Sequence, residues 1–139
     1  MEQRQGSYLI STDPTRLDLD VIHGYLTQSY WSPGISREVV QRALAHSLCF
    51  GIYHDRDGQV GFGRVVTDQA TFGYLADVFV LEAHRGHGLS KTLMEVVMAH
   101  PALQGLRRFT LATRDAHGLY AQFGFTPLEK PERHMEKRG

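Results

Sequence analysis

Three consecutive segments with strand character, between residues 48 and 81, constrain the fold of this chain more than any other feature. Residues 48–54 and 59–67 flank the turn cluster Asp55-Arg56-Asp57-Gly58, and the polar stretch 67–70 makes a second reversal into residues 72–81. Short turns of this kind join antiparallel neighbours. The sequence therefore predicts a three-stranded antiparallel meander at the centre of the fold.

Helices are predicted before the meander. A short strand at residues 8–12 precedes a segment that carries Leu19, Ile22 and Leu26 on one helical face. A loop rich in aromatic residues then leads to a second helix, for which Ser36 is a suitable N-cap.

The pattern changes again after the meander. Apolar residues recur at helical spacing from Leu89 to Val97, and a strand follows at residues 107–113. A short helix carrying Tyr120 ends at Gly124, and a last strand is expected from Phe125.

This order of elements predicts the fold class. Strands 72–81 and 107–113 are joined through a helix, so they form a crossover unit and should be parallel. We expect one α+β (mixed α/β) domain over residues 1–139, with a mostly antiparallel sheet, one parallel pair and about four flanking helices.

Composition narrows the class of protein. Lys plus Arg and Asp plus Glu number 15 each, and this balance argues against nucleic acid as a partner. Cys49 is the only cysteine, which excludes an intramolecular disulfide and suits a cytoplasmic location. Its apolar neighbours predict a buried thiol rather than a nucleophile. No apolar stretch approaches the roughly 18 residues of a membrane span, so no membrane partner is expected.

The stretch from Val78 to Lys91 is the most informative about chemistry. A strand runs into a glycine-rich turn and directly into a helix, which gathers backbone N–H groups at the positive end of a helix dipole and predicts an anion site. A simple tight turn is the alternative. A Walker A loop is excluded because Arg85 and Ser90 stand where it needs glycines, and a dinucleotide fingerprint lacks its third glycine.

The chain resembles the GNAT superfamily of acyl-CoA-dependent N-acetyltransferases. Arg85-Gly86-His87-Gly88-Leu89-Ser90 matches the family signature Q/R-x-x-G-x-G/A except for serine at its last small position. About 30 residues later, Leu119-Tyr120-Ala121-Gln122-Phe123-Gly124-Phe125 looks like the family's LYxxxGF element. The family often has Pro where Glu82 stands and Asn where Thr113 stands.

The resemblance implies acetyl-CoA as co-substrate and assigns residues to it. Backbone groups of Val78, Phe79 and Val80 would pair with the pantetheine arm. The diphosphate would lie against the signature loop, with charge added by Arg85 and Lys91. The implied cofactor-binding residues are Val78, Phe79, Val80, Arg85, Gly86, His87, Gly88, Leu89, Ser90, Lys91 and Thr113.

Two catalytic candidates follow from the chemistry of acyl transfer. Tyr120 matches the family's tyrosine acid, since a phenol can protonate a departing thiolate near neutral pH; a core tyrosine is the alternative. Asp77 is the candidate base, because strand alternation puts it on one face with Leu75 and Phe79, where burial would raise its pKa. A structural carboxylate is equally compatible. Backbone N–H groups near Phe79 would bind the oxyanion if this strand is bulged.

The acceptor site is expected at the aromatic loop. Tyr30, Trp31 and Arg37 lie where the family places its acceptor-binding loop, and His117 just before Tyr120 is added as an assisting residue. Trp31 as a cap over the core is the alternative. No metal is expected, because His84-x-x-His87 lacks a third ligand at a characteristic spacing.

The sequence thus predicts an N-acetyltransferase that acts by direct attack of a primary amine, from a small molecule or peptide, on acetyl-CoA. A non-catalytic CoA-binding or sensing module and a structural or dimerisation domain remain the alternatives, and a homodimer is compatible with both the enzyme and its rivals.

Overall fold

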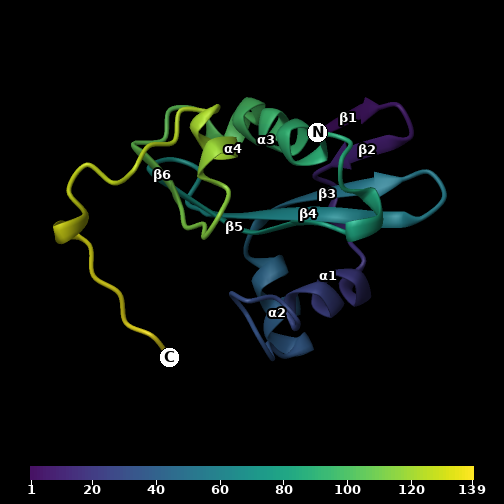
Figure 1. Cartoon of the computed structure of the whole chain (residues 1–139), viewed down its shortest axis with the longest axis horizontal. Coiled ribbons are helices and arrows are strands. Elements are labelled where there is room, and N and C mark those ends of the chain that lie inside the picture. The colour runs from purple at the N-terminus through teal and green to yellow at the C-terminus, as the bar shows by residue number, and fades with distance from the viewer.

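A computed structural model of residues 1–139 contains one six-stranded sheet with helices on both faces (Figure 1). Its strands lie side by side in chain order: β1 (Glu2–Gln5), β2 (Tyr8–Ser11), β3 (Leu48–His54), β4 (Gly58–Thr67), β5 (Phe72–Val80) and β6 (Arg108–Leu111). Neighbours are antiparallel from β1 to β5, whereas β5 and β6 are parallel. The predicted α+β class, meander and parallel pair are confirmed.

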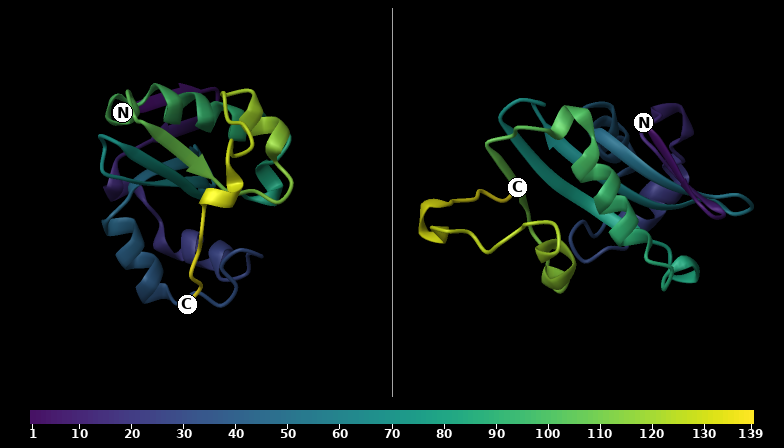
Figure 2. Two further views of the ribbon diagram at one scale, coloured as in Figure 1. Left: turned by 90° about the vertical axis from the view of Figure 1, so that its left-hand side faces the viewer. Right: turned by 90° about the horizontal axis from the view of Figure 1, so that it is seen from above.

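Four α-helices cover the sheet: α1 (Leu19–Leu26), α2 (Arg37–Ala45), α3 (Leu89–Ala99) and α4 (His117–Ala121). Helices α1 and α2 lie on one face, and α3 and α4 on the other (Figures 1 and 2). Ser36 accepts a hydrogen bond from Val39 N and is the N-cap of α2, as predicted. None of the helices combines the length and the apolar character that crossing a bilayer requires.

Each face of the sheet has its own apolar core. The buried face of α3, including Leu93, Met94 and Val97, packs on one side of the sheet in the larger core. On the opposite side, Ile22 and Leu26 of α1 pack with the smaller core. Because the sheet is covered on both faces, its central strands β3 to β5 bury residues on both sides.

A β-bulge interrupts the pairing of β4 and β5. Phe62 opposes Phe79 and Arg64 opposes Ala76, so two residues of β5 face Gly63 alone. Asp77 in this bulge has φ of 59°. The extra residue resets the alternation of side chains, so Leu75 lies in the α3 core and Phe79 in the α1 core. The expectation that Asp77, Leu75 and Phe79 share one face was therefore wrong.

Strands β5 and β6 pair only over a short distance. Their register runs from Phe72 opposite Arg108 to Leu75 opposite Leu111 and then ends. Beyond this point the last residues of β5 and the chain after β6 diverge, and the edge of β5 is left open.

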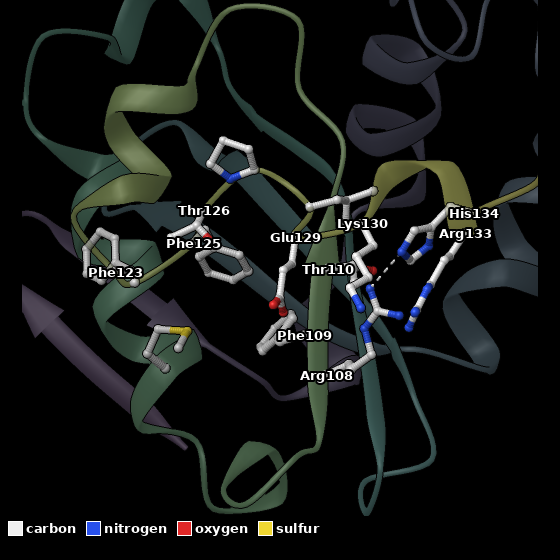
Figure 3. A pocket seen from close by; sticks show the side chains of 14 residues that line it. Arg108, Phe109, Thr110, Phe123, Phe125, Thr126, Glu129, Lys130, Arg133 and His134 are labelled. Atoms are coloured by element: carbon white, nitrogen blue, oxygen red, sulfur yellow. Dashed lines mark hydrogen bonds between the residues drawn. The ribbon is translucent and has the colours of Figure 1, made fainter.

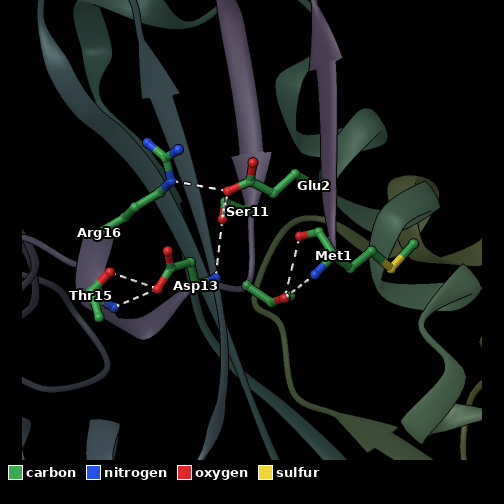
Figure 4. Close-up of polar contacts among 7 residues, drawn as sticks. Met1, Glu2, Ser11, Asp13, Thr15 and Arg16 are labelled. Carbon is green, nitrogen blue, oxygen red and sulfur yellow. Dashed lines mark hydrogen bonds and ion pairs between the residues drawn. The ribbon is translucent and has the colours of Figure 1, made fainter.

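The N-terminal strand β1 was not predicted. All four of its residues are exposed, so it lacks the apolar alternation that marks a half-buried strand. Polar contacts hold it in place: Glu2 accepts hydrogen bonds from the Ser11 hydroxyl at 2.7 Å and from Arg16 Nε at 3.0 Å (Figure 4). These contacts join β1 to β2 and to the turn that follows β2.

The last strand expected from Phe125 is absent, and no strand follows β6. Gly124, with φ of 89°, ends α4 as predicted, but the following segment leads away from the sheet (Figure 1). Pro127 and Pro131 explain part of the difference, because proline supplies no N–H to a strand ladder.

Candidate active site

A cleft of about 940 Å³ opens where β5 and β6 diverge. The last residues of β5 form one wall and residues 112–116 form the other. Helix α1 and the loop after it close one end, and Arg85 and Ser90 of the glycine-rich loop border it as well. The structure therefore brings the predicted signature loop, aromatic loop and Tyr120 to one cavity.

The glycine-rich loop presents a row of free donors. The N–H groups from Gly86 to Lys91 donate to no carbonyl of the loop, and those in the first turn of α3 have no acceptor within the helix. Gly86 and Gly88 have φ of 86° and 70°, which a residue with a Cβ adopts at a cost. These donors stand at the positive end of α3 and suit an anion.

A hollow of about 290 Å³ lies over this loop. It is lined by His84, by most residues of the loop including Lys91, and by Leu119. It shares Val80, Arg85, Ser90 and Leu119 with the large cleft. A long ligand with an anionic group in this hollow can therefore extend into the cleft, and the donor set fits the diphosphate and arm of CoA.

The backbone of Val80 faces the cleft. Leu81 N donates to Val60 O over 2.8 Å, so Val80 and Gly61 form a non-hydrogen-bonded pair whose own N–H and C=O groups point away from the partner strand. By the same alternation Phe79, opposite Phe62, directs its N–H toward β4. Val80 N–H, rather than Phe79 N–H, is the donor on the open edge of β5.

Arg85 does not point at the hollow over the loop. Its Nε donates to Val80 O over 3.0 Å and its guanidinium donates to Tyr25 Oη over 3.2 Å. The side chain thus crosses the open edge of β5 and links it to α1. Tyr25, which stacks on Phe79 at a centroid distance of 4.1 Å, was not singled out as a site residue.

Tyr120 lies at the inner wall of the cleft and is 8% exposed. Burial, and to a lesser degree the nearby Tyr30, raises the pKa of its phenol above the ordinary value of 10.0. Tyr120 consequently keeps its proton throughout the neutral range, which is the state that an acid needs.

Asp77 is part of a polar network below the cleft. Trp31 Nε1 donates to one carboxylate oxygen over 2.8 Å, and Arg64 Nε donates to the other over 2.9 Å. Arg64 also donates to the Ser47 hydroxyl over 3.1 Å. Asp77 does not line the cleft, and both of its oxygens have partners. A carboxylate that is paired with a guanidinium is a weak base, so this geometry favours a structural carboxylate.

The predicted acceptor residues are divided by the structure. Tyr30 and Trp31 line the cleft, and the Arg114 guanidinium lies 3.9 Å from the centroid of the Tyr30 ring. Arg37 is not in the lining and forms an ion pair with Asp20. His117 borders a separate cavity of about 370 Å³, which shares Ala112, Thr113 and Tyr120 with the cleft.

Thr113 lines the cleft, and its hydroxyl accepts a hydrogen bond from Ala116 N over 3.1 Å. This contact caps the chain just before α4, a role that the sequence analysis did not assign. Sequence reasoning also missed Arg64 and Arg114, since neither belongs to a motif and each acts through a partner distant in the sequence.

A further cavity of about 710 Å³ lies between β6 and the C-terminal segment (Figure 3). Glu129, Lys130 and Arg133 approach it from one side, and Arg108 at the start of β6 contacts His134 over 3.3 Å. It borders neither the glycine-rich loop nor Tyr120, so it is separate from the candidate active site.

The remaining reactive groups lie elsewhere. Cys49 is buried, and this burial raises the pKa of its thiol to about 11, as expected for an unreactive cysteine. His84 and His87 do not form a metal site, and no group of three metal-ligating side chains exists in the structure.

Fold and site together define a class of enzyme that binds an acyl-CoA in the opening of a splayed sheet. A family model described as the acetyltransferase (GNAT) domain matches residues 45–127. A Gibberella zeae protein whose name assigns it to the acetyltransferases is 34% identical over 140 residues, covering 85% of this chain and 78% of its own length.

Solved structures agree with this assignment. A GNAT-family structure from Xanthomonas campestris pv. campestris is 57% identical, with a TM-score of 0.91 over 95% of this chain and 93% of that one. Glucosamine-6-phosphate N-acetyltransferase from Arabidopsis thaliana shares the fold at 18% identity, with a TM-score of 0.69 over 94% and 97% of the two chains. The chain belongs to the GNAT family and is an acyltransferase, and this family uses acetyl-CoA as co-substrate.

Proposed function

We propose that this protein is an N-acetyltransferase that transfers an acetyl group from acetyl-CoA to a primary amine by direct attack. The supporting observation is the continuity of two sites. The free N–H groups from Gly86 to Lys91 border a hollow that joins the cleft, and the cleft leads along β5 to the phenol of Tyr120.

The reaction needs no covalent intermediate with the enzyme. The neutral amine nitrogen attacks the thioester carbonyl carbon, the C–N bond forms, and the C–S bond breaks as the thiolate departs. Val80 N–H on the open edge of β5 is a suitable donor to the developing oxyanion. Cys49 is buried outside the cleft lining, which agrees with a direct route.

Tyr120 is proposed as the acid that protonates the departing thiolate. Its phenol lines the cleft and retains its proton at neutral pH because burial raises its pKa. The thiolate of an ordinary thiol, with a pKa of about 8.5, is then converted to a thiol, and the tyrosinate regains a proton from solvent. The proton released by the attacking amine passes to water in the open cleft.

Asp77 is proposed to position Trp31 rather than to act as the base. Its two hydrogen bonds hold the indole of Trp31 at the mouth of the cleft. With Tyr25 and Tyr30, Trp31 makes this mouth aromatic, which suits a small-molecule or peptide amine with an apolar part next to the amino group. A cytoplasmic location, expected from the lone cysteine, agrees with the use of acetyl-CoA.

The decisive experiment measures thiol release from acetyl-CoA in the presence of a panel of amines, including amino acids, polyamines, arylalkylamines and peptides. Amine-dependent release with formation of the N-acetyl product is the expected result. Thermal unfolding with excess CoA tests binding separately, since a ligand at about 100 times its Kd adds about 2.7 kcal/mol of stability. Stabilisation by CoA without release for any amine would favour the non-catalytic binding module.

A further inference from the structure

We propose that His84, held by Tyr8 and Asp57, is a positioning residue that orients the glycine-rich loop for the diphosphate of CoA. The inference rests on the proposed role of this loop. His84 is the residue immediately before Arg85 and is 8% exposed, although it lies in a turn at the end of a strand. Nothing in the proposed reaction uses its ring.

Both ring nitrogens of His84 have partners from other parts of the sheet. Tyr8 Oη, on β2, lies 2.8 Å from Nδ1, and Asp57 Oδ2, in the turn between β3 and β4, lies 2.9 Å from Nε2. A carboxylate only accepts, so Nε2 carries the hydrogen, and in the neutral ring Nδ1 accepts the Tyr8 hydroxyl proton. The two bonds fix the direction of the ring and the backbone that bears it.

The opposite end of the loop is anchored to the same hairpin. The Thr92 hydroxyl, in the first turns of α3, donates to Gln5 Oε1 on β1 over 2.8 Å and lies 3.1 Å from Gly88 O. Within the loop, the ring of His87 lies 5.9 Å from that of Tyr8. The loop from Arg85 to Lys91 therefore spans two buried polar residues that are both tied to the β1–β2 hairpin.

The loop needs this support because it has little of its own. Gly86 and Gly88 have no side chains, and a Cβ at either position would meet no atom within 4 Å. Glycine loses more conformational freedom on ordering than any other residue. Donors that already converge on one point bind an anion without the entropic cost of ordering them, so contacts at the ends of the loop should appear in the affinity for CoA.

The test compares the Kd of CoA, measured by titration calorimetry, with kcat at saturating acetyl-CoA. The variants are Tyr8→Phe, Asp57→Ala and His84→Ala. Tyr53→Phe, which removes the same hydroxyl group from a buried tyrosine on the adjacent strand β3, is the matched control because the Tyr53 hydroxyl has no hydrogen-bond partner.

Tyr8→Phe should raise the Kd of CoA about two- to tenfold, and His84→Ala about tenfold, while kcat at saturation changes less than about twofold. Tyr53→Phe should leave the Kd unchanged. If His84→Ala fails to fold, Tyr8→Phe and the exposed-side variant Asp57→Ala carry the test.

The proposal is overturned if the folded variants bind CoA as the wild type does, if they lower kcat with Kd unchanged, or if Tyr53→Phe raises Kd equally. It is also overturned if the wild type does not bind CoA. Failure of the proposed function has a different signature: CoA binds and responds to these variants, but no amine is acetylated.

Discussion

Trp31 donates its indole N–H to Oδ1 of Asp77 over 2.8 Å, which links the loop after α1 to the bulge of β5 across 46 positions of sequence. The bulge itself is held by the pair between Asp77 and Arg64. One carboxylate thus joins the acceptor side of the cleft to the strand that would bind the thioester.

Asp77→Asn tests whether this carboxylate is a base. A positioning role predicts that kcat falls less than about tenfold and that the acidic limb of the pH profile of kcat/KM is retained. A base predicts a loss of roughly 10²–10⁴ and loss of that limb. Combining Asp77→Asn with Trp31→Phe should give less than the sum of the two single effects, because both remove one contact; independent effects would contradict the link.

Trp31→Ala should raise the KM of the acceptor amine more than the KM of acetyl-CoA. The indole borders the part of the cleft that lies next to α1, whereas the proposed diphosphate hollow does not include it. Steady-state kinetics with each substrate varied in turn measures both constants. Equal increases would place Trp31 outside the acceptor site.

Tyr120→Phe should lower kcat by roughly 10²–10⁴ with little change in the Kd of CoA. The phenol pKa is raised above 10.0, so in the wild type the acid stays protonated as the pH rises, and kcat should not decline below about pH 10. A profile of kcat from pH 6 to 10 checks this direction. A variant with full activity would leave Tyr120 as a core residue.

Tyr53→Phe should stabilise the protein. The Tyr53 hydroxyl is buried without a hydrogen-bond partner, and burial raises its pKa. Removing an unsatisfied buried hydroxyl is expected to add about 1 kcal/mol to the free energy of unfolding, which urea denaturation can measure. The ring must remain, because it packs over Gly51, where a Cβ would lie 2.2 Å from the hydroxyl oxygen. A loss of stability would point to a bridging water.

Cys49 should resist alkylation in the native state. Burial raises the pKa of its thiol to about 11, so at pH 8 only about one thiol in a thousand is a thiolate, and its sulfur is covered by the α1 core. Iodoacetamide labelling followed by mass spectrometry should be slow without denaturant and fast with it. Fast labelling of the folded protein would mean that this core opens readily.

The parts of the fold with strong local patterns were predictable. The apolar spacing from Leu89 to Val97 produced α3 as expected, and Ser36 caps α2 because capping depends on neighbours only three residues apart. Strand β1 was missed because polar exposed residues carry no periodic signal. The absent last strand shows the opposite case, a segment with strand residues that finds no partner in the structure.

The candidate site divides in the same way. The sequence by itself determined that a glycine-rich turn runs from a strand into a helix and that Tyr120 follows on a short helix, since both depend on local motifs. Only the tertiary structure decided that a bulge turns Asp77 toward Arg64 and Trp31, that Arg85 crosses the edge of β5, and that His84 is tied to Tyr8. Strand register and bulges arise from pairing between distant segments, and a shift of one residue moves a side chain to the opposite face of the sheet.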